Sequence, residues 1–402
     1  MDRKPIASEK DRDAKRRLRF HNFWFPTAKK LISNIFNFSH EEFEAADIEG
    51  PVIVAINHAS AYDPIFVGLA FKNKILTYVA SEHLMRTGLP GRLINRYILV
   101  IPHQKGSKRK RTALVMIKRI KKGESIFLAV EGEQSWDGVS MPVMPHTAGM
   151  IKKSGASLIT YKLEGAYLAS PRWSRSIRKG KVYGHPVNVY SPETLSSMED
   201  EEIEKILIDD LSFDVWEWQE NQPNGPIRFR CKKGGNAEGI ERAVCTCPVC
   251  KSIGKLRSRK DTVKCSCGFS LRLDDIGRFD PAEPFETIVD WEACDRKLIN
   301  SLLEKATSGA EVFSDEDIKL LQIGDSHDDE VIAEGRLSLV VYEDGAAFRI
   351  KDKEFRFKNI SDMGMVLASR IVFSDESGYY EMRAKDANLR KYLIAYSMKE
   401  KS

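Results

Sequence analysis

Residues 52–63 read VIVAINHASAYD, and this stretch decides the class of fold. The apolar run at 52–56 is rich in β-branched residues and lacks polar alternation, which is typical of a parallel strand buried on both faces. His58 therefore follows the C-terminal end of a strand, where open α/β sheets place their ligand crevices.

His58 and Asp63 can meet only if the chain turns between them. On a helix, five residues turn the chain by about 500°, which would leave the two side chains about 140° apart. On a straight strand they would face opposite sides. We expect residues 60–62 to form a turn, with Asp63 as the N-cap of a helix and Pro64 at its first position. A carboxylate that accepts a histidine N–H raises the basicity of the ring, so the pair predicts a general base, with a loop-capping histidine as the alternative.

A second motif, residues 127–138, reads FLAVEGEQSWDG and repeats this arrangement. An apolar strand at 125–130 runs into a polar loop, where Glu131-Gly132 takes the place that His58 takes after the first strand. About 70 residues separate the motifs, enough for two further β-α units, so both loops are expected at one edge of one parallel sheet. No serine or cysteine is placed as a covalent nucleophile, which favours direct attack by a substrate hydroxyl on an activated acyl group.

Together the two motifs resemble those of the glycerolipid (lysophospholipid) acyltransferase family, over about residues 20–218. The family's Asn-His, four residues and Asp matches the first motif, and its strand followed by Pro-Glu-Gly-Thr-Arg-Ser matches VEGEQS at 130–135. The resemblance implies that His58 and Asp63 form the catalytic pair. It also implies that Asn57, Glu131 and Gly132 bind the acceptor.

Two positions depart from the family pattern. The family's Thr-Arg is Glu133-Gln134 here, and its intermediate motif, ILVIPHQKG at 98–106, lacks the usual arginine. A bound phosphate needs positive charge or oriented N–H groups nearby. The candidate cations are Lys105, Arg172 and Arg175.

The resemblance implies an O-acyltransferase that uses acyl-CoA or acyl carrier protein (acyl-ACP) as the donor. The implied acceptor is a lysophospholipid, in the first place 1-acylglycerol-3-phosphate, which would give phosphatidic acid. A rival hypothesis is a catalytically degenerate acyltransferase that serves as a membrane-associated zinc-ribbon scaffold, and the altered Glu133-Gln134 loop favours it. The retained His58, Asp63 and Glu131 favour the enzyme, since a scaffold needs none of them.

A cysteine-rich segment follows, with CTCPVC at 245–250 and CSCG at 265–268. Four thiolates on two knuckles predict a structural zinc ribbon with no open metal position, and Cys245 is an alternative ligand. Phe269 is the one aromatic residue there that could stack a base, so nucleic-acid binding is not expected despite the nearby basic residues. The predicted ligands are Cys247, Cys250, Cys265 and Cys267.

Composition bounds the class of protein. The 402 residues are 42% hydrophobic and 30% charged, which predicts two or three domains with packed cores and a charged exterior. We expect no transmembrane helix and no secretory signal, because no run of about 20 apolar residues and no N-terminal apolar region occur. Basic and aromatic residues interleave over 15–36, which suits an anionic membrane surface. The prediction is a cytoplasmic protein, peripheral on the cytoplasmic membrane face; a helix packed on the core is the alternative for this segment.

Strands and helices alternate from 51 to 188, which predicts an α/β acyltransferase domain with a mostly parallel central sheet flanked by helices. An acidic helix over 192–219 comes next. After the ribbon, a helix at 291–305 precedes β-rich runs from 331 and a final helix at 388–398, a pattern that resembles a PH-like or GRAM-like module. The predicted parts are a membrane-proximal region 1–40, the acyltransferase domain 41–222, the ribbon 240–275, and the C-terminal domain 285–402.

Overall fold

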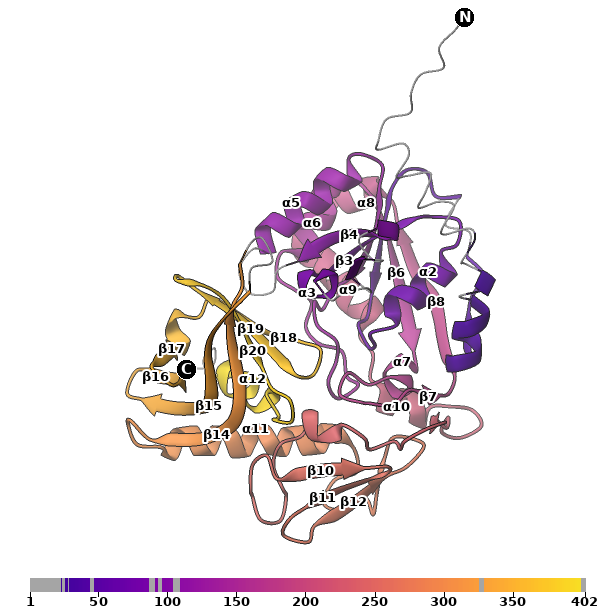
Figure 1. Ribbon diagram of the computed structural model, residues 1–402. Coiled ribbons are helices and arrows are strands. Elements are labelled where there is room, and N and C mark those ends of the chain that lie inside the picture. The colour runs from indigo at the N-terminus through magenta and orange to yellow at the C-terminus, as the bar shows by residue number, and fades with distance from the viewer. Residues whose placement is uncertain are drawn as a thin grey trace, which may run out of the picture.

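The computed structural model describes residues 23, 26–27, 29–43, 47–86, 91–92, 96–103, 109–324 and 329–398. Three parts follow one another along the chain: an α/β domain, a small group of short strands, and a β-rich domain flanked by helices (Figure 1). The basic residues predicted at 15–19 lie outside the described residues.

The central sheet of the α/β domain has seven strands in the order β1-β8-β6-β2-β5-β3-β4. β2 runs parallel to β5 and β6, and β3 runs parallel to β5 and β4, whereas β8 is antiparallel to β6. The predicted mostly parallel sheet is therefore confirmed. The strands are β1 (Phe38–His40), β2 (Val52–Ile56), β3 (Leu76–Ser81), β4 (Leu99–His103), β5 (Ser125–Ala129), β6 (Ser157–Glu164) and β8 (Val182–Tyr190).

Every residue of β2 is buried, because helices cover both faces of the sheet. Val54 and its even-numbered neighbours pack in one core cluster with Phe66 of α2, while Ile53 and Ala55 belong to a second cluster with Ile151 of α6. This alternation follows from the two-residue period of a strand. The covering helices are α2 (Asp63–Ala70), α5 (Arg109–Ile120), α6 (Thr147–Ser154) and α9 (Asp200–Leu211), and the short ones are α3 (Glu82–Met85) and α7 (Ala166–Ala169).

The single acidic helix predicted over 192–219 is wrong: three helices occupy this stretch, namely α8 (Pro192–Ser197), α9 and α10 (Val215–Glu220). The chain is extended at Met198 and Glu199, and Glu199 forms a capping box with Glu202 that starts α9. Asp214 accepts the N–H of Trp216 and starts α10. The helix-cap residues therefore interrupt what looked like one apolar periodicity.

Short antiparallel strands make the second part. One sheet has the order β10-β11-β12-β13, and a separate pair joins β7 to β9. Hairpins connect β10 to β11 and β11 to β12, which brings the two cysteine segments together. The elements are β7 (Arg178–Lys179), β9 (Arg230–Cys231), the 3-10 helix η2 (Ile240–Arg242), β10 (Leu256–Arg259), β11 (Thr262–Cys265), β12 (Ser270–Leu273) and β13 (Phe279–Asp280).

The third part starts with α11 (Ile288–Lys305), which Thr287 and Asp290 cap three residues before the predicted start. Seven antiparallel strands follow in the order β17-β16-β15-β14-β20-β19-β18, and α12 (Arg390–Ser397) ends the described chain. This confirms antiparallel strands closed by a helix; likeness to a PH-like module stays a prediction. The strands are β14 (Glu311–Gln322), β15 (Glu330–Tyr342), β16 (Gly345–Ile350), β17 (Lys353–Arg356), β18 (Asp362–Val366), β19 (Arg370–Asp375) and β20 (Gly378–Arg383), with the 3-10 helix η3 (Phe357–Asn359) between β17 and β18.

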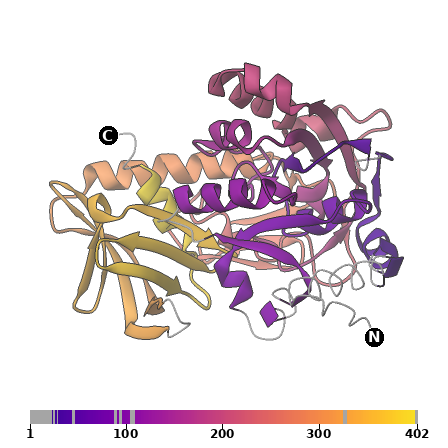
Figure 2. The same ribbon diagram turned by 90° about the horizontal axis from the view of Figure 1, so that it is seen from above.

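The C-terminal domain packs against the α/β domain through α3 and β20 (Figures 1 and 2). His83 of α3 is buried, with Nε2 2.9 Å from Tyr379 Oη and Nδ1 2.8 Å from a Glu381 carboxylate oxygen. Arg86 donates to Asp329 at 2.8 Å. The two domains therefore share a polar interface close to the motif edge of the sheet.

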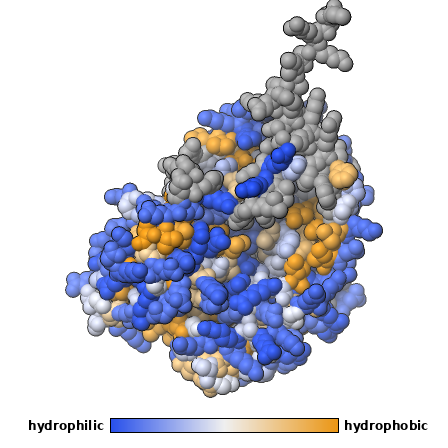
Figure 3. All heavy atoms as spheres, viewed as in Figure 1, coloured by the Kyte–Doolittle hydropathy of each residue, from blue (hydrophilic) through white to orange (hydrophobic). Residues whose placement is uncertain are grey.

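The exterior is mostly polar on the face shown in Figure 3, where hydrophobic residues gather in small patches. Within the described part of the chain, no helix combines the length and the apolarity that crossing a bilayer requires.

Candidate active site

His58 and Asp63 meet because residues 60–62 turn the chain back. The N–H of Asp63 donates to Ser60 O at 3.2 Å, and His58 Nδ1 lies 2.9 Å from Asp63 Oδ2. The predicted turn is confirmed, and Pro64 lies in the first turn of the helix, one position later than predicted. The predicted N-cap is wrong, because α2 begins at Asp63 itself and Tyr62 is the N-cap. The Asp63 side chain forms its hydrogen bonds with the preceding loop, residues 58–60, and does not cap the helix.

The Asp63 carboxylate is held rigidly in a buried position. Its Oδ2 accepts the backbone N–H groups of Ala59 and Ser60, each at 2.9 Å, in addition to the His58 ring. The Asp63 side chain is 0% exposed, whereas that of His58 is 18% exposed. An ionised carboxylate requires the proton on Nδ1, which leaves Nε2 able to take a proton from a substrate hydroxyl.

Glu131 lies opposite His58 at the same edge of the sheet. Ile56 of β2 pairs with Ala129 of β5. His58 and Glu131, each two residues beyond its strand, therefore face each other. The N–H of His58 donates to Glu131 Oε1 at 3.1 Å, and the N–H of Met141 donates to Oε2 at 2.9 Å. Burial raises the pKa of Glu131 to about 7, although both N–H donors act against this rise. The sequence-based expectation that the two motifs share one edge is thus confirmed.

A glycine is required at position 132, because the loop after β5 passes very close to Met144 there. Its φ is +69°, and a Cβ there would lie 2.0 Å from Met144 Sδ. Any L side chain would therefore meet both backbone strain and a steric clash.

Asn57 has a structural role that the sequence did not predict. Its Nδ2 donates to Leu163 O at 2.9 Å and its Oδ1 accepts the Leu163 N–H at 2.8 Å. Both ends of the amide are therefore used to tie the end of β2 to β6. Asn57 therefore positions the backbone before His58, and it also lines the smaller cavity, so its substrate-binding role stays a prediction.

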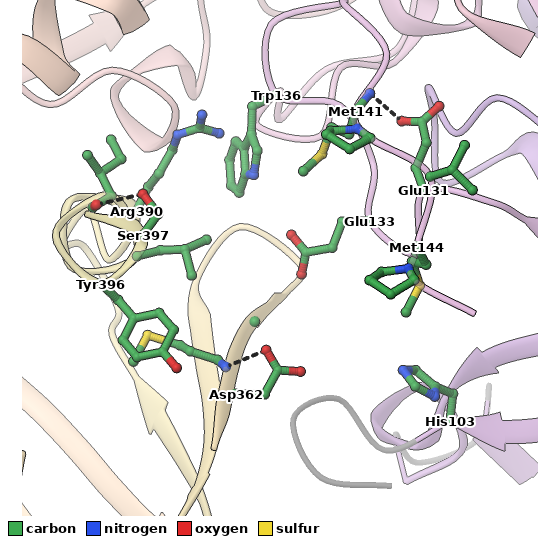
Figure 4. Close-up of a pocket in the computed structure, with 18 of the residues that line it drawn as sticks. His103, Glu131, Glu133, Trp136, Met141, Met144, Asp362, Arg390, Tyr396 and Ser397 are labelled. Carbon is green, nitrogen blue, oxygen red and sulfur yellow. Dashed lines mark hydrogen bonds between the residues drawn. The ribbon is translucent and has the colours of Figure 1, made fainter. Parts of the chain in front are cut away.

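Two cavities border this edge. The smaller has a volume of about 10 Å³, is lined by His58, Ser135 and Ser140 among others, and has room for roughly one water-sized group. The larger, of about 460 Å³, lies between the α/β domain and the C-terminal domain (Figure 4). Glu131 lines both, so the larger cavity reaches the residue that contacts the His58 backbone.

Arg172 was predicted to hold an acceptor phosphate, but the structure uses it as a joint between domains. Its Nη1 lies 3.2 Å from Glu133 Oε2, its Nη2 donates to Met365 O of β18 at 2.7 Å, and its guanidinium sits 4.4 Å from the Trp136 ring centre. The N–H of Met365 also donates to Glu133 Oε1 at 3.3 Å. Arg172 lines neither cavity, so the phosphate role is corrected to one of domain contact. The Glu133 that departs from the family pattern forms part of this joint.

The structure describes one of the other two predicted cations, Arg175. Arg175 pairs with Glu241 at 3.2 Å and lines neither cavity. Lys105 lies outside the described residues. Sequence reasoning missed the C-terminal lining of the larger cavity, which includes Met363 and Leu393, because no motif links those positions to the first 222 residues.

The four predicted cysteine ligands form one cluster. Their Sγ atoms all lie within 4.8 Å of one another. Two of the separations are 3.6 Å, between Cys247 and Cys267, and 3.7 Å, between Cys250 and Cys265. Cys245, the alternative ligand, is outside this cluster and buried, with its N–H bonded to Asp295 at 2.7 Å.

A paired histidine and aspartate at the C-terminal edge of a parallel sheet define the class: an α/β domain with a site suited to base catalysis. Residues 35–163, which hold both motifs, match the model of the Acyltransferase family. This segment of the chain is therefore an acyltransferase domain of that family.

Among solved structures, the chain is similar to a 1-acyl-sn-glycerophosphate (LPA) acyltransferase, PlsC, from Thermotoga maritima. The identity is 19% and the TM-score 0.42, over 54% of this chain and 86% of that one. A search of curated proteins found no match.

Proposed function

We propose that the protein transfers a fatty acyl group from a thioester, acyl-CoA or acyl-ACP, to the free hydroxyl of a lysophospholipid. The acceptor we propose is 1-acylglycerol-3-phosphate, with phosphatidic acid as the product. The acyltransferase domain supports the reaction class. The observation that carries the proposal is the 2.9 Å contact between His58 Nδ1 and Asp63 Oδ2, in a ring that stays partly exposed.

In this mechanism His58 is the general base. Nε2 takes the proton of the acceptor hydroxyl while the oxygen attacks the thioester carbon, and Asp63 stabilises the imidazolium that forms. Collapse of the tetrahedral intermediate breaks the C–S bond, and the leaving thiolate receives the proton from Nε2. The products are the new ester and the free thiol, and the His58 ring returns to its neutral state, so atoms and charges balance. Base catalysis of this kind contributes roughly 10²–10⁴ in rate.

We also propose that the enzyme sits on the cytoplasmic face of an anionic membrane. Residues 29–36 are helical, and this segment buries Ile32 and Phe36 in the core while Lys29, Lys30 and Leu31 are exposed. Cations beside an exposed apolar side chain suit a lipid headgroup region. Flotation with vesicles of anionic or neutral lipid tests this, and equal recovery on both would contradict it.

The cysteine cluster fits a structural zinc ion. A tetrahedral site with Zn–S bonds of about 2.3 Å has S–S edges of about 3.8 Å. The separations of 3.6 and 3.7 Å lie close to that edge and far from the length of a disulfide. Four thiolates would fill the coordination of the metal, so its role here is to hold the two knuckles together. We propose this zinc as a stabiliser of the ribbon, outside the reaction.

A substrate panel tests the function directly. The purified full-length chain is incubated with palmitoyl-CoA or palmitoyl-ACP and with lysophospholipids of different headgroups, and products are detected by mass spectrometry. We expect a new diacyl product, fastest with 1-acylglycerol-3-phosphate. Absence of product with every pair, in protein that is folded and binds anionic vesicles, would favour the rival scaffold hypothesis.

A further inference from the structure

The larger cavity has walls from two domains. One wall is the loop after β5, residues 131–145, and the other consists of β18 and α12. Figure 4 shows Trp136, Met141 and Met144 on one side of the open space, with Asp362 and Tyr396 on the other. A volume of about 460 Å³ lies within the range of small-molecule sites.

Apolar side chains from both domains dominate the lining. The α/β domain contributes Met141, Val143 and Met144, and the C-terminal domain contributes Met363, Leu393 and Ile394. Methionines adapt well to flexible apolar ligands, because the thioether chain is unbranched and polarizable. When an apolar ligand covers apolar surface in a cavity, that surface is removed from water, and this favours binding.

Three of the charged groups in the lining, Glu133, Arg296 and Arg390, take part in ion pairs within the protein. Arg296 and Arg390 both contact Glu292, and Glu133 pairs with Arg172. Arg390 also lies 4.2 Å from the Trp136 ring centre. More of the surface that lines the cavity is apolar than polar.

The position of the cavity relates it to the reaction. Glu131 lines this cavity and also the small one beside His58, and it accepts the His58 backbone N–H. A chain lying in the larger cavity could thus reach Glu131, which contacts the backbone of the proposed base. Resting on the proposed function, we propose that the cavity binds the long-chain fatty acyl group of a substrate, and that the C-terminal domain forms half of this acyl site.

Photo-crosslinking tests the proposal without turnover. Two palmitoyl probes carry a diazirine near the methyl end, one as the CoA thioester and one as 1-acylglycerol-3-phosphate, and each is irradiated with the full-length His58→Ala variant. We expect crosslinked peptides that contain Met363 or Leu393 in at least one arm, and that arm identifies whether donor or acceptor occupies the site. Crosslinks confined to residues before 222 in both arms, or none at all, would overturn the proposal.

Cavity-filling variants give a second readout. Ile394→Trp should reduce crosslinking and slow turnover of 16-carbon substrates by at least about 10-fold, while 8-carbon substrates stay within about 2-fold. Val143→Trp fills the opposite wall and should act in the same direction, which covers the case where one variant fails to fold. The control is Val331→Trp, at an exposed position outside the cavity. Equal effects on long and short chains in both folded variants would overturn the acyl site.

The two proposals fail in different ways. If the wild-type chain transfers no acyl group to any acceptor, the proposed function is refuted. Probe labelling, and its loss in Ile394→Trp, would still test whether the cavity binds an acyl chain. If transfer is normal and labelling never reaches the C-terminal domain, the cavity proposal alone falls.

Discussion

Arg172 and Glu133 form an ion pair, 3.2 Å from Nη1 to Oε2, and both residues also bond to the backbone of Met365 in β18. The motif loop of the α/β domain is thus fastened to the C-terminal domain. The Glu133 that looked like a loss of the phosphate-binding pattern has a structural use. The loop that contacts His58 therefore depends on a domain that begins more than 100 residues later in the chain.

Arg172→Ala should destabilise the protein by about 3 kcal/mol, because it removes the cation that pairs with Glu133 and the donor to three backbone carbonyl groups. Urea unfolding measures the change, and a cycle with Glu133→Gln should give a coupling of about 1–3 kcal/mol. The matched control is Arg175→Ala: the Arg175 side chain is 46% exposed in its pair with Glu241, and its loss should cost under about 1 kcal/mol. Equal costs for the two arginine variants would argue against the joint.

Gly132→Ala should destabilise the motif loop by about 2 kcal/mol or more, since the loop needs a positive φ and has no room for a Cβ. Adding Met144→Ala removes the nearest atoms and should restore part of the lost melting temperature. The backbone strain remains, so recovery should be incomplete. The control is Gly155→Ala. Gly155 also has a positive φ but has open space around it, so this variant measures the backbone strain without the steric clash.

Glu131→Gln should make stability less dependent on pH. With a folded pKa of about 7 against an ordinary value of 4.5, the carboxyl holds its proton more tightly in the folded state. Its contribution to stability therefore falls as pH rises from about 4.5 to 7, by up to about 3 kcal/mol. The variant cannot ionise, so its stability relative to wild type should increase between pH 5 and 8.

Unfolding at several pH values measures this difference, with Glu201→Gln on the exposed side of α9 as the control. A constant gap between Glu131→Gln and wild type from pH 5 to 8 would show that burial does not perturb this carboxyl.

Zinc analysis of undamaged protein should give about one equivalent, and chelation should lower the melting temperature. The ribbon also supports α11, because Thr246 O accepts the indole N–H of Trp291 at 2.8 Å. Cys265→Ser should mimic chelation, whereas Cys294→Ser, outside the cluster, should not. Less than about half an equivalent of metal would count against the site.

Much of the α/β domain could be predicted because its signals are local. The strand predicted from the apolar run at 52–56 is β2 at Val52–Ile56, and it is buried on both faces as its composition indicated. The His58–Asp63 contact followed from a turn that sequence spacing alone demanded. Local chemistry was therefore enough to locate the edge of the sheet that carries the site.

Other features had no local signal. β14 was missed, because EVFSDEDIKLLQ is acidic and polar for a strand, and it contains Asp317 at a φ of +57° where the ladder shifts register. The roles of Arg172 and Asn57 depend on partners 39 and 106 residues away. The interdomain cavity depends on how two domains dock, which no motif in either one encodes.

The acyl-transfer rate of His58→Ala, measured under saturating substrates beside its melting temperature, tests the central claim most directly. The account predicts a loss of at least about 100-fold at an unchanged melting temperature, with His40→Ala, a histidine in β1 outside both cavities, close to wild type. A folded His58→Ala variant that turns over at nearly the wild-type rate would contradict it.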